Sequence, residues 1–160
     1  MKPSLESVIT AHYRSLYSAA YSICGNHPDT EDAVQDAFTR YFTSKKHFES
    51  QEHIRAWLLR VVMNRAIDIC RARKRHPLPL DENLTPCELQ DPQEQELLNA
   101  VLELPEHYRM PLHLHYYEDY SIKEIAAILR LRESTVKMRL LRGKEQLRKR
   151  LLKEESFYGN

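Results

Sequence analysis

The stretch that most constrains the fold is residues 121–152, which have the sequence SIKEIAAILRLRESTVKMRLLRGKEQLRKRLL. Ser121, with Glu124 three residues later, forms the capping-box pattern of a helix N-terminus, and apolar residues at helical spacing follow it. A break at residues 130–133 separates this short helix from a second, more basic helix that is predicted to start near Ser134. Two helices joined by a few residues, with the second more basic, are typical of a helix-turn-helix.

The predicted second helix has an apolar stripe along one side. The stripe consists of Val136, Leu140, Leu147 and Leu151 at helical spacing. Gly143 lies on the same stripe, where a small residue would let another helix approach. We therefore expect this side of the helix to pack against the rest of its domain.

The opposite face of this helix suits duplex DNA, because the second helix of the motif enters the major groove. Arg142 can donate to a guanine edge, and Thr135 can contact a thymine methyl group. Lys137 and Arg139 flank this face and suit phosphates, which add affinity without sequence information. The alternative is a basic amphipathic helix whose polar face is only solvated.

Composition predicts an all-α fold. Only 3 of the 160 residues are glycine, 42% are apolar, and no long stretch alternates with period two. Four of the eight prolines fall in residues 76–92. We expect two small helical domains, 1–75 and 93–153, joined by a proline-rich acidic linker at 76–92 and followed by a tail at 154–160, with the helix-turn-helix in the second domain.

No apolar run approaches the ~20 residues of a membrane-spanning helix, and the first residues lack the apolar core of a secretory signal. The sequence therefore predicts a cytoplasmic protein with no membrane insertion.

Charge is distributed in blocks that the formal net charge of +1 conceals. Residues 53–76 hold seven Arg or Lys against one Asp, and residues 130–153 hold ten against two acids. Residues 77–98, between them, hold six acids and no base. Two basic blocks separated by an acidic segment predict two contacts with a polyanion.

The first basic block lies on a long helix predicted over residues 51–75, with Ser50 as its cap. Trp57 on this helix is either a core residue or a ring that stacks bases of single-stranded nucleic acid. A polar loop at 44–52, with two lysines and Phe48, precedes the helix and favours the nucleic-acid interpretation.

Two further helices are predicted before this loop. The first spans 4–24 and ends at a Gly-Asn pair at 25–26, and the second starts with Asp29 as its N-cap. On the residues alone, the polar face of the second helix is a solvated surface supported by an Asp36–Arg40 pair.

The second domain is predicted to open with helices over 93–103 and 105–117. We expect a kink or a new helix start near Pro111, because proline lacks the backbone donor that a helix interior needs.

No catalytic, metal or cofactor site is indicated. The sequence has no nucleophile–base pair and no phosphate-binding loop, and no acid or cysteine completes a metal set with the histidines between 107 and 115. Cys24 and Cys70 lie among apolar residues and are expected in the core, and Cys87 lies in the linker; none has CxxC spacing.

Two separated stretches resemble bacterial RNA polymerase sigma factors of the extracytoplasmic-function group. In residues 29–75, DTEDAVQDAFTRYF is similar to the helix that docks on the polymerase, and IRAWLLRVVMNRAIDICRARKR is similar to the promoter-melting helix. Residues 104–151 contain LPEHYRMPLHL, SIKEIAAIL and STVKMRLLRGKEQLRKRL in the family's order. Together with the first helix and the linker, the resemblance covers nearly the whole chain.

The resemblance implies a promoter-specificity subunit that is not an enzyme and holds no cofactor. It implies three partners: core RNA polymerase, at the clamp of its largest subunit and at its flap, promoter DNA, and an anti-sigma factor. The polymerase contacts implied by position are Asp32, Gln35, Asp36, Phe38 and Arg40. The contacts implied with the −10 element are Lys45, Phe48, Trp57, Arg60, Asn64, Arg71, Arg73, Lys74 and Arg75. The contacts implied with the −35 element are Ser134, Thr135, Lys137, Met138, Arg139 and Arg142.

Three positions depart from the family pattern. Arg130 stands where the turn usually has glycine, Ser134 stands where glycine is usual, and Met138 stands where serine is usual. If Arg130 adopts the left-handed conformation, it costs on the order of 1 kcal/mol. Two other functions remain open on the residues: a free-standing helix-turn-helix regulator, and a nuclease or other metal-dependent enzyme.

Overall fold

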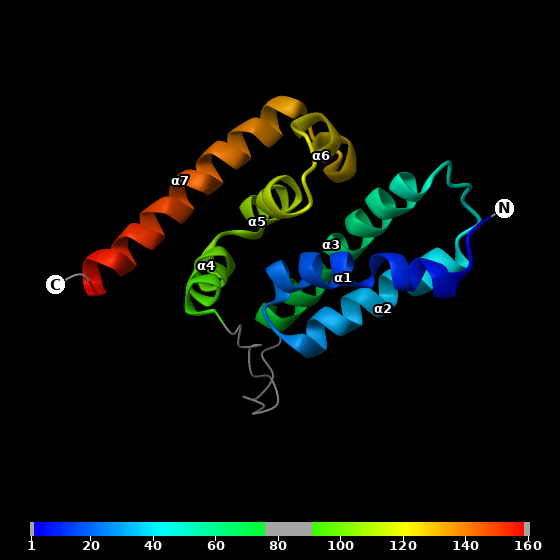
Figure 1. Cartoon of the computed structure of the whole chain (residues 1–160), viewed down its shortest axis with the longest axis horizontal. Helices are drawn as coiled ribbons and strands as arrows, with labels where there is room; N and C mark the ends of the chain where they lie inside the picture. Colours follow the sequence, from blue (N-terminus) through cyan, green and yellow to red (C-terminus); the bar gives the residue numbers. More distant parts are fainter. Residues whose placement is uncertain (1, 76–90, 159–160) are drawn as a thin grey trace. The chain divides into compact units, whose positions relative to one another are not determined.

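The structure, a computed structural model, describes residues 2–75 and 91–158, with side chains up to residue 153. These residues form seven α-helices and one π-helix and contain no strand, so the all-α prediction is confirmed for them (Figure 1). The elements are α1 (Leu5–Cys24), α2 (His27–Thr43), α3 (Gln51–Arg75), α4 (Pro92–Glu103), α5 (Glu106–Leu112), the π-helix η1 (His113–Tyr117), α6 (Ile122–Leu129) and α7 (Glu133–Tyr158).

The chain divides into two compact units, one holding α1 to α3 and the other α4 to α7. The linker predicted at 76–92 falls almost entirely on residues 76–90, which lie outside the described residues, as does Cys87. Within the described residues, no helix is both long and apolar enough to cross a membrane.

Two adjacent residues form the junction between α1 and α2: Gly25 caps the end of α1, and Asn26 caps the start of α2. Gly25 ends α1 with a φ of 74°, as predicted, and its N–H donates to the Tyr21 carbonyl at 2.9 Å. The predicted cap of α2 is wrong by three residues, because the Asn26 side chain accepts from the Asp29 N–H at 3.0 Å. Pro28 then occupies the first turn, where its missing N–H is harmless.

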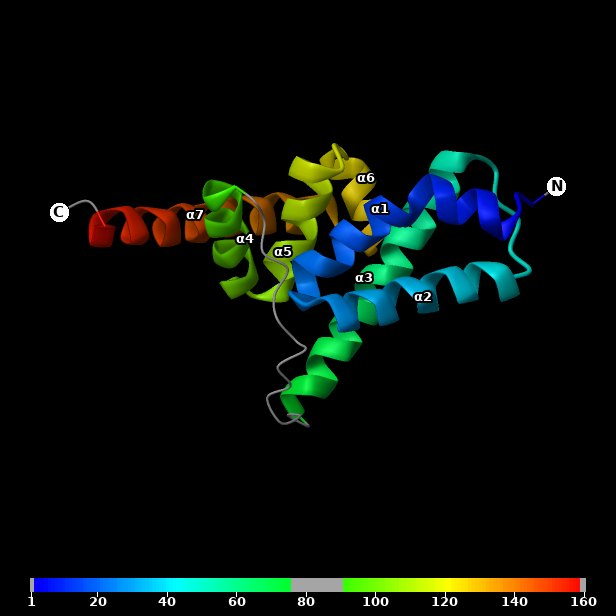
Figure 2. The ribbon, with the colours of Figure 1, turned by 60° about the horizontal axis from the view of Figure 1, so that its bottom comes forward.

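Helix α3 crosses both α1 and α2, and this determines which of its residues are buried (Figure 2). Leu59, Met63 and Ile67 are buried, whereas Trp57 and Val61 are only half-buried. A helix that packs on two neighbours buries a wider arc than a helix with one apolar stripe. The core of this unit therefore extends around α3 beyond a single stripe.

The segment around Pro111 contains the predicted irregularity. Pro111 lies inside α5, where it cannot donate to the preceding turn, and the chain changes to π-helical bonding from His113 onward. The Glu118 N–H then donates to the His113 carbonyl, five residues back, at 3.2 Å. This change of helix type begins two residues after Pro111, where a kink or a new helix start was expected.

The helix-turn-helix has the predicted parts. The Ser121 hydroxyl accepts from the Glu124 N–H, and the Glu124 carboxylate accepts from the Ser121 N–H, both at 3.1 Å. These bonds to Ser121 lower the pKa of the Glu124 carboxyl group. Arg130 is left-handed, with a φ of 56° and ψ of 49°, which is the strained conformation considered from the sequence.

Helix α7 packs through the predicted stripe. Val136 and Leu140 are buried, and a Cβ added to Gly143 would lie 3.1 Å from Tyr108 Cβ and 3.1 Å from Leu112 Cδ1. The absence of a side chain at Gly143 thus allows α5 to approach α7, as predicted.

Candidate nucleic-acid interface

The N-terminal half of α7 presents the residues predicted to contact the −35 element. Ser134, Lys137 and Arg142 are exposed, Thr135 and Arg139 are half-buried, and Met138 is 44% exposed. Most of these residues border one hollow of about 410 Å³ on the surface of the unit. The helix-turn-helix therefore offers a single continuous face for binding.

Two residues of α5 share this hollow and were not predicted as part of the face. His107 and Tyr108 line it together with the α7 side chains. From the sequence, His107 was considered only as a metal ligand. In residues 2–75 and 91–158, no group of three or more His, Cys, Asp or Glu side chains is arranged to hold a metal ion.

The cations of this face form no ion pair with other described residues. This holds for Lys137, Arg139 and Arg142, whereas further along α7 Arg150 pairs with Glu103 at 2.9 Å. Cations without an intramolecular partner remain available to phosphates or base edges.

Helix α2 presents the predicted polymerase-binding face. Asp32, Gln35 and Arg40 are exposed, but Asp36 pairs with Arg65 of α3 and not with Arg40 as predicted. The Asp36 carboxylate is therefore oriented by a neighbouring helix.

The two phenylalanines of α2 differ in burial, and the one predicted as a polymerase contact is the buried one. Phe38 is only 6% exposed. Its ring packs in the core beneath the exposed side chains of α2 and does not lie on the surface. Phe42, four residues later, is 67% exposed and was not predicted as a contact. Apolar residues at 37, 38, 41 and 42 occupy too wide an arc for spacing alone to show which ring is buried.

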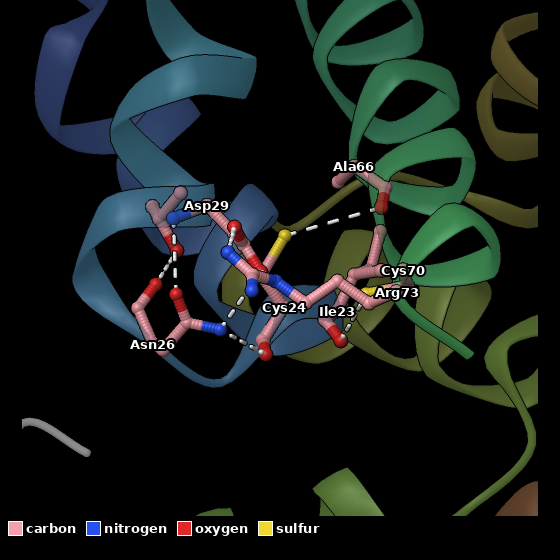
Figure 3. Close-up of polar contacts among 8 residues, drawn as sticks. Ile23, Cys24, Asn26, Asp29, Ala66, Cys70 and Arg73 are labelled. Carbon is pink, nitrogen blue, oxygen red and sulfur yellow. Dashed lines mark hydrogen bonds and ion pairs between the residues drawn. The ribbon is translucent and has the colours of Figure 1, made fainter. Parts of the chain in front are cut away.

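A buried ion pair joins the start of α2 to the end of α3 (Figure 3). Arg73 donates from Nε to Asp29 Oδ2 at 2.7 Å and from Nη2 to Asp29 Oδ1 at 2.6 Å. The Asp29 side chain is 4% exposed and also accepts from Asn26 Nδ2 at 3.0 Å. The hydrogen bonds from Arg73 hold the pKa of Asp29 below its usual value, and the same bonds raise the pKa of Arg73.

This pair changes the interpretation of the basic run at the end of α3. Arg73 was predicted to contact DNA, but the side of its guanidinium that carries Nε and Nη2 binds Asp29. Arg71, Lys74 and Arg75 are exposed around it. Because Arg73 follows Asp29 by 44 residues, sequence spacing offered no signal for the pair.

The two described cysteines lie beside this pair (Figure 3). Cys24 Sγ is 3.9 Å from the Ala66 carbonyl oxygen, and Cys70 Sγ is 3.4 Å from that of Ile23. Both are half-buried at the contact between α1 and α3, and thus less enclosed than the core positions expected.

The loop between α2 and α3 is anchored by aromatic rings. The Phe48 ring lies 5.5 Å from that of Tyr41, 5.3 Å from His53 and 5.4 Å from Trp57, which it meets edge to face. Phe48 and Trp57 are both half-buried, so each ring packs against its neighbours and is also partly exposed at the surface. For Trp57, this position agrees with both interpretations of the sequence. On α3, Asn64 is exposed and Arg60 is half-buried.

A second hollow, of about 230 Å³, lies against this loop. Its lining residues are Lys2, Ser44, Lys45, Lys46, His47 and Phe48. The hollow is therefore surrounded mainly by cationic and polar groups, with one aromatic wall.

The helix-turn-helix carries cations that pair with no other described residue, and the other unit carries a second basic helix beside an aromatic loop. Together these features define a two-domain helical DNA-binding protein. Family comparisons support and extend this description. Residues 8–76 match the family described as Sigma-70 region 2, and residues 94–147 match Sigma-70, region 4.

Full-length relatives match along nearly the whole chain. The chain is 32% identical to the ECF RNA polymerase sigma factor SigE of Mycolicibacterium smegmatis, over 96% of this chain and 64% of that protein. It is 31% identical to RNA polymerase sigma factor SigV of Bacillus subtilis, over 96% of this chain and 95% of the relative.

Two solved structures share the fold. The sigma factor RpoE of Bartonella quintana, in complex with the anti-sigma factor NepR, has a TM-score of 0.75 at 22% identity, over 91% of this chain and 95% of that one. CnrH, in complex with the cytosolic domain of CnrY, has a TM-score of 0.67 at 23% identity, over 94% and 88%.

The chain belongs to the ECF RNA polymerase sigma factors, and it directs promoter-specific initiation by RNA polymerase. It is not an enzyme, because in this family the polymerase performs the chemistry. The assignment favours the sigma-factor prediction over a free-standing regulator and over a metal-dependent enzyme.

Proposed function

We propose that the two units divide promoter recognition between them. The unit of α1 to α3 binds the clamp of the polymerase largest subunit and opens the −10 element, and the unit of α4 to α7 binds the flap and recognises the −35 element as duplex. The observation that carries this proposal is the face of α7. Arg139 and Arg142 line the hollow, Lys137 is exposed outside it, and none of the three forms an ion pair with another described residue.

In the −35 contact, Arg142 donates to a base edge and Thr135 contacts an adjacent base, because both lie on the hollow. Lys137 lies outside the lining of the hollow and is exposed, which suits a phosphate. Met138 adds an exposed apolar contact, suited to a thymine methyl group. His107 of α5 adds a polar group at the edge of the same surface.

In the −10 contact, the loop hollow receives a base that has left the stack. Unstacking one base costs a few kcal/mol, and polar groups and an aromatic wall such as Phe48 can offset this cost without ATP. Arg71, Lys74 and Arg75 then follow the backbone of the separated strand, because they are exposed in the last five residues of α3.

For polymerase binding, the contacts are the exposed side chains of α2 that share one surface. They are Asp32, Gln35 and Arg40, with Asp36 held in place by Arg65 and with the exposed ring of Phe42 nearby in sequence. A polar face that includes one exposed aromatic ring resembles a protein interface more than a solvated surface. The protein would act with the polymerase in the cytoplasm.

An anti-sigma factor is the third proposed partner. The two solved structures that share the fold contain the anti-sigma factor NepR and the cytosolic domain of CnrY, respectively. A partner that covers these faces would prevent both polymerase and promoter binding.

The test is capture of bacterial core RNA polymerase by the purified chain, followed by transcription from a library of genomic fragments. We expect stable binding and new, discrete start sites. The Arg40→Ala variant should lose core binding, whereas Arg142→Ala should keep core binding and lose start sites. Failure to bind core, together with tight binding of duplex by the chain alone, would instead establish a free-standing regulator.

A further inference from the structure

Lys2, which belongs to neither predicted DNA-binding set, holds the end of α2. Its Nζ donates to the Tyr41 carbonyl oxygen and, at 2.6 Å, to the Ser44 carbonyl oxygen. The same ammonium group lies 4.4 Å from the centroid of the Tyr41 ring. Two of its three donors are thus used within the protein, and its charge rests on an aromatic face.

These contacts occur where α2 ends and the loop begins. The last carbonyl groups of a helix have no partner in the next turn, and the helix dipole favours a cation there. The C-cap residue Ser44 has a φ of −71°, so α2 lacks the left-handed glycine cap that ends α1. The Tyr41 carbonyl accepts from the Ser44 N–H at 3.3 Å, and Lys2, 42 residues away from Ser44 in sequence, adds a second donor to this end of the helix from another part of the chain.

Tyr41 joins the N-terminal segment to the loop. Its ring is 1% exposed, its hydroxyl donates to the Pro3 carbonyl at 2.9 Å, and its ring lies 5.5 Å from that of Phe48. Lys2 and Phe48 also line the same loop hollow. The position of Lys2 is therefore coupled, through one buried residue, to the shape of the hollow.

We propose that Lys2 is a positioning residue for −10 specificity. By fixing the last turn of α2, it sets the point at which the loop departs and hence the hollow that selects the unstacked base. This inference rests on the proposed function of the loop. Lys2 also lines the hollow, but its proposed effect on base selection is exerted through its bonds to Tyr41 and Ser44.

Lys46 provides a matched control. It lines the same hollow and carries the same charge, but its side chain makes no hydrogen bond with α2 among the described residues. Replacing Lys46 removes one cation near the DNA and leaves the end of α2 capped. Replacing Lys2 removes both a cation and the two hydrogen bonds that its ammonium group donates at the end of α2.

The experiment compares Lys2→Met, Lys2→Arg and Lys46→Met in the full chain bound to core polymerase. The first measurement is the ratio of transcription from promoter pairs that differ by one base in the −10 element. We expect Lys2→Met to reduce this discrimination by about fivefold, the scale of an exposed charge-assisted contact. Lys2→Arg should restore most of it, and Lys46→Met should weaken all promoters alike.

The second measurement needs no polymerase. Trp57 is the only tryptophan of the chain and its ring lies 5.4 Å from Phe48, so acrylamide quenching of its fluorescence reports on the loop. Quenching should increase in Lys2→Met alone. Thermal unfolding of each variant verifies that it is folded.

If Lys2→Met behaves like Lys46→Met in both measurements, the proposal is wrong and Lys2 contributes only charge. A different failure concerns the loop itself. If Lys45→Ala and His47→Ala leave −10 discrimination unchanged while Lys2→Met still alters Trp57 quenching, the loop does not select a base. In that case the proposed function of the loop fails, and the specificity role of Lys2 fails with it.

Discussion

Helices α3 and α7 are both strongly basic, but they use their charges differently. On α3, Arg73 is bound to the buried Asp29, and Arg65 is bound to Asp36. On the N-terminal half of α7, Lys137, Arg139 and Arg142 have no ion pair with any described residue. Part of the charge on α3 therefore stabilises the fold, whereas the charge on this half of α7 is available for binding.

The difference follows from the neighbours of each helix. Helix α3 packs against α2, whose sequence supplies several carboxylates, so its arginines meet acids within the unit. Lys137, Arg139 and Arg142 of α7 pair with no carboxylate among the described residues, whereas Arg150 further along α7 pairs with Glu103 of α4. A count of Arg and Lys in the sequence would assign both helices the same binding role. The structure distinguishes them, because it shows which cations are paired with carboxylates.

The largest expected effect is on stability. Arg73→Met should lower the free energy of unfolding of the α1–α3 unit by about 2 kcal/mol, because it leaves the buried Asp29 carboxylate without its main partner. Arg73 is 30% exposed, which keeps the loss below that of a fully buried pair. Urea denaturation measures the change. Lys74→Met, at the adjacent exposed position, is the control. If both variants lost the same free energy of unfolding, the distinction between cations that stabilise the fold and cations free to bind a partner would fail.

The next effect is on DNA recognition by α7. Arg142→Ala should lower the affinity for the preferred −35 sequence by about tenfold and should reduce discrimination against other sequences. Lys137→Ala should weaken binding to all sequences alike and reduce its salt dependence. Fluorescence anisotropy with matched and mutated −35 duplexes distinguishes the two. If both variants lost the same affinity for every duplex, whatever its sequence, the roles assigned to Arg142 and Lys137 would be contradicted.

A smaller effect is expected with pH. Because the pKa of Asp29 is lowered in the folded state, its pairing stabilises the protein above the unfolded-state pKa of about 4 and is lost as pH falls through the lower folded-state value. The stability difference between the wild type and Arg73→Met should therefore narrow in acid. Denaturation at neutral pH and at about pH 3 tests this. If the stability difference between the wild type and Arg73→Met stayed constant with pH, the charge of the Asp29 carboxylate would not be what stabilises its contact with α3.

The smallest expected effect compares neighbouring residues of α3 on single-stranded DNA. Lys74→Gln should reduce the slope of log affinity against log salt concentration by about 0.7, the value for one phosphate contact on a single strand. Arg73→Gln should change the slope less, because Asp29 already neutralises that charge. Binding titrations of a −10 oligonucleotide at several salt concentrations measure both slopes.

Local signals in the sequence predicted the helix-turn-helix well. The Ser121–Glu124 capping box, the left-handed Arg130 and the close approach at Gly143 depend on residues a few positions apart, where spacing and backbone preferences decide the structure. The all-α class and the span of the long third helix were predicted for the same reason.

The parts that were missed depend on contacts between distant residues. Asp29 was expected to cap α2 because it suits that role when its own helix is considered alone, and the family resemblance implied that Arg73 contacts DNA. Their pairing, and the link from Lys2 to Ser44, require the packing of three helices to be known first. The sequence contains many acids and bases, and nothing local specifies which of them meet.

The distance of 44 residues between Asp29 and Arg73 also has a consequence for synthesis of the protein. Chains fold as they leave the ribosome, starting from the N-terminus. The start of α2 cannot acquire its partner until the last turn of α3 has emerged, so a nascent chain completes α2, the proposed polymerase-docking helix, only together with α3, the proposed strand-opening helix. On these proposed roles, we expect a partly translated chain to compete poorly for polymerase, since it lacks the ion pair that joins the two helices.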